Sequence, residues 1–477
     1  MRSEGASLPS QFLNFFKPLV AFMPEVSTPD RRVGLSEKLL WTALALVMYL
    51  LMSEIPLYGI TVGQGIDPFQ YLRVIFASNR GTLMELGIGP IVTAGLILQL
   101  LAGSGIINVD FGNSEDRTLF TSVTKFFSIL MIIFTATVYI IGGAYGNITI
   151  EAATLIFLQL IAAGLILMLL DELVQKGWGI GSGISIFIIA GVAQKIWWSC
   201  LAPLGPMPDG KFLGAFLAFF QSILGGDGLS AALYRTENLP DMIGFFATVI
   251  VFIIVIYLEG IRVEIPIAHA RFRGYRAKYP VKLLYVSNIP VILSSALFAN
   301  IYLFSQIIWA NFNQNNQNFI LSLLGTYNAS SQEPTGGLVY YVIPPRTFNT
   351  LLTDPVRALV YVGIMAVMCI IFARVWLEVG GLGSRAVAKQ LMDSGMQVPG
   401  FRRAYKPLQQ LLDRYIPTLA LLGGVVVGIV ASLADFFGVF GTGMGALLAV
   451  GILYQLYQQL AQEQMVEMYP ILSRVMG

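Results

Sequence analysis

Few residues in this chain have the type and spacing that bond-making chemistry requires. The two cysteines, Cys200 and Cys369, show no metal-ligand spacing and no disulfide framework, and both lie in or beside apolar segments, where a lone cysteine usually packs as a small hydrophobic side chain. The single histidine, His269, has no second imidazole with which to share a metal and is expected to be an ordinary surface residue. Phosphate-binding loops, zinc spacings and a Gly-x-Ser-x-Gly turn are absent from the sequence. We therefore expect no catalytic residues, no metal, no cofactor and no enzymatic activity.

The acidic residues also argue against ion-coupled transport. A coupled carrier usually keeps carboxylates near the middle of the membrane to bind its ion or proton. In this chain the acidic residues of the apolar segments lie near segment ends instead: Glu54, Asp171, Glu259 and Asp435. The polar residues nearer the segment centres are neutral: Thr93, Gln99, Gln159, Asn300 and Gln306. This distribution favours a passive pathway over a pump or a coupled carrier.

The elements that carry these residues must lie in a membrane. Of the 477 residues, 56% are hydrophobic and only 12% are charged, and the mean hydropathy is +0.72. A soluble globular protein carries about 25% charged residues, which cover its surface. The net charge of +2 is too small to indicate nucleic-acid binding. The composition predicts an all-α polytopic membrane protein.

Ten segments are apolar enough to cross a bilayer as helices of about 20 residues. They cover approximately residues 39–60, 82–103, 119–141, 152–170, 181–200, 242–261, 286–308, 355–373, 416–436 and 440–458. We divide the chain into a cytosolic or interfacial segment (1–35), a half with spans one to five (36–240) and a half with spans six to ten (241–477). Within the first segment, residues 11–26 are expected to lie at the interface, with four phenylalanines dipping into the lipid: Phe12, Phe15, Phe16 and Phe22.

Lysine and arginine are distributed unequally between alternate connections. If the N-terminus is cytosolic, 22 of the 29 basic residues lie at the N-terminal segment, the even-numbered connections and the C-terminal tail, and seven lie on or near the outer connections. Cytosolic loops of membrane proteins carry an excess of these residues. We therefore predict a multi-pass protein of the cell membrane, or of the endoplasmic reticulum membrane in a eukaryote, with both termini cytosolic.

Two of these basic connections are long. Residues 262–285 have the alternation of a short hairpin around Gly274, and residues 374–415 form the longest inner loop. Their positive charge has two possible meanings. It could only orient the chain in the membrane, or it could form a surface that docks a polyanion such as ribosomal RNA through its phosphates.

Glycines and prolines interrupt the apolar segments at several places. The apolar stretch from Asp67 to Ala77 is too short to cross, and residues 87–90 (Gly-Ile-Gly-Pro) interrupt the span that follows it. Either a short re-entrant helix precedes a half-helix beside an internal cavity, or a kinked helix lies under an outer loop. Similar breaks at residues 177–183, 289–290 and 438–445 favour two inverted five-helix halves with a path between them. Each break is followed by branched aliphatic residues, which predict a hydrophobic waist that closes by dewetting.

Several long motifs carry a resemblance to a known family. Residues 82–99 (TLMELGIGPIVTAGLILQ) and 170–184 (LDELVQKGWGIGSGI) resemble the two signatures of the SecY/Sec61α protein-translocation channel. Residues 262–267 (RVEIPI) and 279–292 (YPVKLLYVSNIPVI) are similar to the connection between its sixth and seventh helices. The resemblance covers essentially the whole chain and is nearest to archaeal SecY.

The resemblance implies a clamshell of two pseudo-symmetric halves around an hourglass pore. Six positions would form its hydrophobic constriction, hereafter the ring residues: Ile88, Val92, Ile184, Ile188, Ile292 and Leu448. The re-entrant segment, about residues 66–79, would be a plug helix that fills the outer funnel at rest. A lateral gate between spans two and three and spans seven and eight would open to lipid, with Thr93 and Asn300 at its polar positions. Thr135 stands where the family pattern suggests a carboxylate.

The resemblance also implies partners. Arg273 and Arg402 match loop-tip arginines that engage the ribosome or another cytosolic partner. A single-span SecE-like (γ) subunit would clamp the two halves, and a small Secβ-like (β) subunit would accompany it. Signal sequences, nascent polypeptides and membrane lipid complete the expected set. The leading hypothesis is thus a passive protein-conducting channel, and the alternative is a ten-helix secondary transporter of a small solute.

Overall fold

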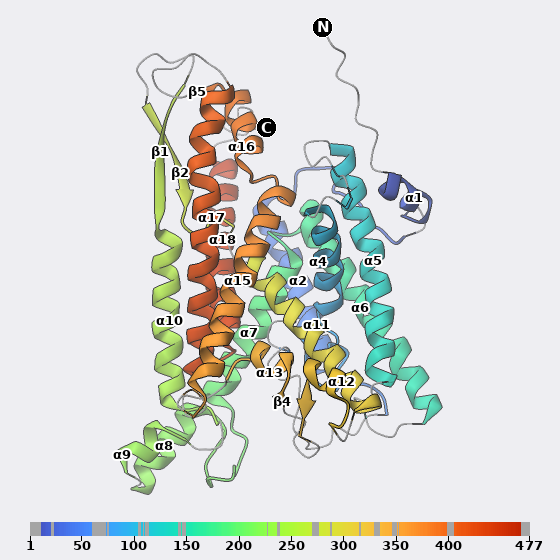
Figure 1. Ribbon diagram of the computed structural model, residues 1–477, viewed down its shortest axis with the longest axis vertical. Helices are drawn as coiled ribbons and strands as arrows, with labels where there is room; N and C mark the ends of the chain where they lie inside the picture. The colour runs from blue at the N-terminus through green and yellow to red at the C-terminus, as the bar shows by residue number, and fades with distance from the viewer. Residues whose placement is uncertain are drawn as a thin grey trace.

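The computed structural model describes residues 11–20, 23–59, 73, 76–103, 106–107, 109, 114–141, 145, 149–226, 228–235, 239–269, 276–286, 289–313, 316–328, 334–345, 351, 353–397 and 405–468. Most of the predicted plug, Gly274, Arg273 and Arg402 lie outside these residues. Within them the chain is predominantly helical (Figure 1).

Up to residue 240, the described chain contains a short N-terminal helix, four long helices, the shorter α4 and two short helices at the end. The helices are α1 (Gln11–Val20), α2 (Leu35–Glu54), α4 (Gly89–Gly103), α5 (Ser114–Ile141), α6 (Ile150–Leu173), the π-helical turn η1 (Val174–Trp178), α7 (Gly183–Leu201), α8 (Ala215–Gly225) and α9 (Leu229–Leu233). Phe16 of α1 packs against Phe126 and Phe127 of α5 with ring centroids 5.6 Å apart, whereas Phe15 is 72% exposed. An exposed phenylalanine beside an anchored one suits a helix at the membrane interface.

The C-terminal half contains, in its described residues, five long helices and the strands. Its elements are α10 (Met242–Gly260), β1 (Arg262–His269), β2 (Arg276–Lys282), α11 (Ile289–Phe312), α12 (Phe319–Leu324), β3 (Thr326–Tyr327), β4 (Pro334–Gly336), α13 (Leu338–Val342), α15 (Pro355–Val379), α16 (Ser384–Asp393), β5 (Met396–Gln397), α17 (Tyr405–Phe436) and α18 (Gly443–Met468). In Figure 1, α10, α15, α17 and α18 stand on one side and α5 and α6 on the other, with α11 and α4 between them.

Eight helices of the described chain are long and apolar enough to cross a membrane: α2, α5, α6, α7, α10, α11, α15 and α17, with α6 counted together with η1 and α15 together with α16. Two further helices occupy the positions of the second and tenth predicted spans. α4 has only 15 residues, less than the about 20 that a full crossing needs. α18 has 26 residues, but glutamines and glutamates are frequent in its last third. The all-α polytopic fold class is confirmed.

Several predicted boundaries were wrong, each for a local reason. The first span is α2 at Leu35–Glu54 rather than 39–60, and the second is helical only from Gly89 because the glycine break occupies its first turn. The ninth begins at Tyr405, well before the expected 416. Its early turns keep an apolar stripe, Leu408, Leu412 and Ile416, that is fully buried. Outside the membrane a helix needs only such a stripe, and not an apolar surface all round.

The two long basic connections form one folded unit. β1 pairs with β2 in an antiparallel hairpin, as the alternation predicted. The 374–415 connection is not an open loop, because it contains α16 and β5 and the extended ends of α15 and α17. β5 pairs with β1 through Ala268–Gln397 and His269–Met396, so the sheet order is β2-β1-β5. Figure 1 shows this unit at one end of the molecule and α8, α9, α12 and β4 at the other.

Candidate functional site

The site is built around the break that precedes α4. Gly87 has a φ of +54°, a conformation that side chains with a Cβ rarely adopt. A Cβ at this position would lie 2.1 Å from the carbonyl oxygen of Phe76. The next residue, Ile88, donates its N–H to that same oxygen at 2.8 Å. The end of the predicted plug segment is therefore bound directly to the start of α4.

Two further contacts hold the end of that segment, and a third holds the turn that follows it. Arg73 and Glu85 form an ion pair with 2.7 Å between Nη2 and Oε1, and their side chains are 5% and 2% exposed. The other oxygen of Glu85 accepts the N–H of Gly81. The hydroxyl of Tyr49 in α2 donates to the carbonyl of Ala77 at 3.0 Å. Removing one partner of a buried ion pair destabilises the fold strongly, because the other charge is then left buried without compensation.

The ring residues come from four elements of both halves. Ile88 lies directly before α4 and Val92 in its first turn, Ile184 and Ile188 lie in α7, Ile292 in α11 and Leu448 in α18. The structure places all six in one continuous apolar cluster, here called the central cluster. Ile88, Ile188 and Leu448 are fully buried and Val92 is 8% exposed, while Ile184 and Ile292 are partly buried against the same cluster. Aliphatic side chains from both halves thus belong to one apolar contact network.

A seam between the halves runs beside this cluster. Asn300 of α11 donates its Nδ2–H to Oγ1 of Thr93 in α4 at 3.0 Å and to the carbonyl of Ala296 at 2.7 Å. Phe134 of α5 contacts Phe304 of α11 with ring centroids 6.1 Å apart. The two polar residues expected at the gate therefore meet across the seam. The hydrogen bond between Asn300 and Thr93 adds only about 1 kcal/mol to the apolar packing across the seam, because neutral hydrogen bonds contribute little net stability.

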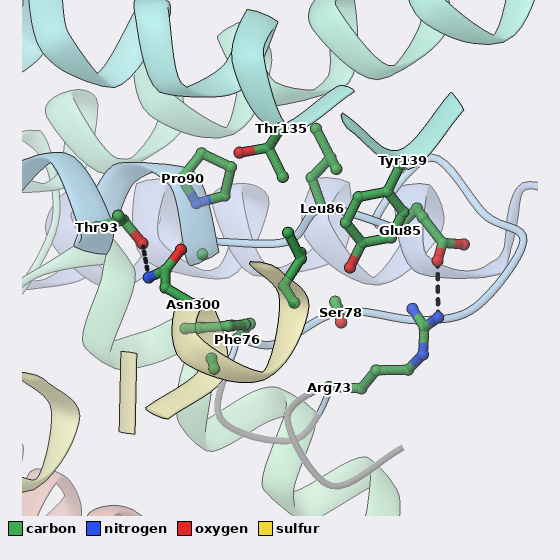
Figure 2. Close-up of a pocket in the computed structure, with 13 residues that line it drawn as sticks. Arg73, Phe76, Ser78, Glu85, Leu86, Pro90, Thr93, Thr135, Tyr139 and Asn300 are labelled. Atoms are coloured by element: carbon green, nitrogen blue, oxygen red, sulfur yellow. Dashed lines mark hydrogen bonds and ion pairs between the residues drawn. The ribbon is translucent and has the colours of Figure 1, made fainter. Parts of the chain in front are cut away.

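A pocket of about 460 Å³, open solvent included, lies at this seam (Figure 2). It joins the features above, because its lining includes Arg73 and Glu85 on one side and Thr93 and Asn300 on the other. Thr135, which occupies the position where a carboxylate was expected, also lines it. Figure 2 shows Thr135 and Tyr139 of α5 beside Pro90 and Leu86. The pocket wall is thus shared by both halves and by the end of the predicted plug segment.

The basic connections present exposed cations. Within the described residues of the two connections, the exposed basic side chains are those of Arg262, Lys278, Arg374, Arg385, Lys389, Lys406 and Arg414. Lys278 hydrogen-bonds to Glu264, and this contact lowers the pKa of the Glu264 carboxyl. Arg273 and Arg402 lie outside the described residues, so their expected positions at the loop tips stay predictions. Such a cationic surface suits a polyanionic partner.

Sequence reasoning missed two sets of residues. The Arg73–Glu85 pair joins positions twelve residues apart through a turn, a spacing that has no periodic signal. Asp171 and Asp435 were placed only near span ends, yet both are buried, at 8% and 6% exposed. A carboxylate at the end of one span, followed by a glycine run that opens the next, was the available signal. His269 lies in β1, where its backbone pairs with Met396, and both cysteines are buried as expected.

Comparison with known families supports one interpretation. A family model described as SecY matches residues 82–457, and a model described as the plug domain of Sec61p matches residues 47–81. The chain is 46% identical over 468 residues to the protein translocase subunit SecY of Pyrococcus horikoshii, covering 95% of this chain and 97% of that protein. It is 45% identical over 472 residues to the same subunit of Pyrococcus furiosus, covering 96% and 98%.

Solved structures agree. The fold matches a structure described as that of a protein conducting channel with a TM-score of 0.82 and 39% identity, covering 95% of this chain and 98% of the other. It also matches Sec61 in the canine ribosome-channel complex from the endoplasmic reticulum with a TM-score of 0.79 and 39% identity, over the same shares.

Proposed function

The chain belongs to the SecY family, and from this premise we propose that it is the channel-forming subunit of a protein translocase, with the ring residues as its constriction. The observation that carries the proposal is the meeting of aliphatic side chains from α4, α7, α11 and α18 beside a seam between the halves. The relatives and matched structures are translocase subunits and channels, so they support this function and not the small-solute transporter.

The constriction acts through its apolar character. Flexible aliphatic side chains offer a crossing polypeptide no hydrogen bonds, so the chain slides past without sequence preference. When no polypeptide is present, an apolar waist stays dry and excludes ions. The sequence contains no phosphate-binding loop, and the driving force is therefore external, from an elongating ribosome or from trapping on the far side.

The plug segment (66–79) and the seam regulate this path. The bonds from Phe76 to Ile88 and from Arg73 to Glu85 support a resting state in which the plug is fastened to the first ring residue. The seam at Thr93 and Asn300 is the lateral gate. An apolar signal helix that enters it gains about 0.8 kcal/mol for each CH₂ group transferred to lipid, so a few CH₂ groups outweigh the hydrogen bond of about 1 kcal/mol between Thr93 and Asn300.

A reconstitution experiment tests this function. The chain should co-purify with a small SecE-like subunit and, in proteoliposomes, translocate a signal-bearing polypeptide. A photoreactive residue at Asn300 should cross-link to the signal sequence of an arrested substrate, whereas the same probe at exposed Ile254 of α10, a helix outside the gate, should not. Saturable small-solute uptake by a chain without such a partner would support the transporter instead.

The basic connections are the cytosolic docking surface for the ribosome, and both termini lie on the same side. The charge bias and the exposed cations support this orientation, and a Sec61 relative occurs in a ribosome-channel complex. A Gly274→Cys variant should react with an impermeant thiol reagent in inside-out vesicles and not in right-side-out vesicles. Bound ribosomes should block the reaction.

The loop-tip arginines give the matched test of the binding site. In the Arg273→Glu/Arg402→Glu double variant, ribosome affinity should fall and its salt dependence should become shallower, because two phosphate-pairing cations are lost. Ribosomes should then no longer protect the thiol introduced by Gly274→Cys. Unchanged affinity and salt slope would mean that the charges only orient the chain.

A further inference from the structure

One carboxylate stands where the N-terminal half turns from its fourth span into its fifth. Asp171, near the end of α6, is 8% exposed. Its Oδ1 accepts the backbone N–H of Ile184 in the first turn of α7 at 2.9 Å. The side-chain amide of Gln175 donates to both carboxylate oxygens, at 2.9 and 2.8 Å. The aspartate is thus fixed on one side by η1 and on the other by the start of α7.

The C-terminal half repeats the arrangement between its fourth and fifth spans. Asp435, near the end of α17, is 6% exposed. Its Oδ1 accepts the N–H of Gly443, the first residue of α18, at 2.6 Å. The hydroxyl of Tyr361 in α15 donates to Oδ2 at 3.2 Å. A carboxylate near the end of one helix therefore binds the N-terminus of the next in both halves.

Glycine makes both contacts possible. A Cβ at Gly183 would lie 2.6 Å from Cα of Asp171. A Cβ at Gly443 would lie 2.4 Å from the nitrogen of Asp435. Both helices begin in contact with the preceding helix, at a distance that any larger residue would increase. The two starts are consequently tied to neighbouring helices by a close backbone approach and a charge-assisted hydrogen bond.

These two starts are also parts of the chain that carry ring residues. Ile184, which is itself bonded to Asp171, and Ile188 lie in the first two turns of α7. Leu448 lies in the second turn of α18, which begins at Gly443. A negative side chain at a helix N-terminus is favoured by the unpaired N–H groups and the helix dipole. Fixing the first turn of a helix fixes the direction of the side chains that follow it.

We propose that Asp171 and Asp435 are matched positioning residues, one in each half, that hold α7 and α18 so that their aliphatic side chains close the constriction. The proposal rests on the proposed function, since it takes the ring residues as the seal. The proposal adds to that function that two carboxylates outside the ring, Asp171 and Asp435, determine where the ring side chains lie. In an inverted repeat the two caps act from opposite faces of the membrane.

A third aspartate provides the matched control. Asp241 is the N-cap residue of α10 itself and accepts the N–H of Gly244 at 2.7 Å, so it caps its own helix and not the next one, and α10 carries no ring residue. Asp171→Ala, Asp435→Ala and Asp241→Ala each remove one carboxylate from a helix N-terminus. If the first two caps position the seal, only those two variants should leak ions.

The measurement is the resting conductance of reconstituted channels in planar bilayers. Asp171→Ala and Asp435→Ala should each raise it by roughly fivefold, the population shift that a lost N-cap produces. Asp171→Asn and Asp435→Asn keep an acceptor oxygen and should stay near wild type. Gln175→Ala and Tyr361→Phe keep the aspartates but remove a hydrogen bond that holds each of them. These variants should raise the resting conductance by less, and they replace an alanine variant that does not fold.

Three outcomes overturn the inference. Equal leakage in Asp241→Ala would show that any lost cap opens the channel. Wild-type conductance in folded Asp171→Ala and Asp435→Ala would show that the aspartates do not control the seal. Where these variants do not fold, wild-type conductance in folded Gln175→Ala and Tyr361→Phe would show the same. If Ile188→Asn leaks in either of the last two cases, the proposed function survives and only the positioning role is lost; if Ile188→Asn is also silent, the ring assignment fails with it.

Discussion

Replacing Glu85 with alanine should destabilise the closed arrangement by about 3–5 kcal/mol, because it leaves the Arg73 guanidinium buried without its carboxylate. The pair is 2.7 Å long, and both side chains are at most 5% exposed. Glu85 also accepts the N–H of Gly81, so the turn before α4 loses a second contact. The end of the plug segment should separate from α4, and the resting ion conductance should rise.

Thiol labelling measures this release directly. A cysteine at Ser78, which is 9% exposed, should react with an impermeant reagent much faster in the Glu85→Ala background. Arg73→Met/Glu85→Leu removes both charges and should restore much of the lost stability. Glu37→Ala breaks the exposed pair with Arg31 and should change little, because surface pairs contribute little. Slow labelling and unchanged thermal stability in Glu85→Ala would contradict the fastening role of this pair.

The second large effect is expected at the constriction. Ile188→Asn/Ile292→Asn puts hydrogen-bonding groups into the apolar waist and should favour its wetting, so that ions cross at rest. Deleting residues 68–77 should separately raise the conductance, and combining the two changes should raise it further. Polypeptides with weakened signal sequences should also cross more readily. Planar-bilayer recordings and a translocation assay measure these effects.

A lipid-facing isoleucine gives the control. Ile254 of α10 is 42% exposed, so Ile254→Asn should cost about 1–3 kcal/mol of stability for a poorly satisfied polar group without any conductance. If the ring residues faced lipid, the double variant would behave as Ile254→Asn does. Folded but silent channels in both the double variant and the deletion would reject the constriction and the plug.

The backbone breaks were predictable from the sequence because glycine adopts positive φ values that other residues avoid and is unfavourable inside a helix. Residues 87–90, 177–183 and 438–445 were expected to interrupt helices, and Gly87, Gly177, Gly181, Gly438 and Gly441 all have positive φ values. α7 begins at the last residue of its break, Gly183, and α18 begins within its break, at Gly443. The SecY fold and the channel function, which rested on the motifs around these breaks, are confirmed by the family matches.

Contacts between distant charges and polar groups were not predictable in the same way. The partners of Asp171 and Asp435 depend on how two helices meet at a turn, which no periodicity encodes. The early start of α17 at Tyr405 was missed because a search for uniformly apolar spans ends at Lys406 and Arg414, although a buried stripe continues through Leu408 and Leu412. The meeting of Thr93 and Asn300 was expected from the family resemblance alone, and the hydrogen bond between them is a finding of the structure.

The two-residue strand β5 connects the two basic connections mechanically. Because Gln397 and Met396 pair with β1, the connection after α10 and the connection after α15 cannot move independently. α17 has 32 residues and is therefore about 48 Å long, well beyond the about 30 Å hydrocarbon core. A partner that binds either connection is therefore coupled to α10, α15 and α17 at the same time. A force that a bound partner exerts on either connection should therefore move α10, α15 and α17 together. Breaking the pairing between β5 and β1 should uncouple these helices from each other even though the partner still binds.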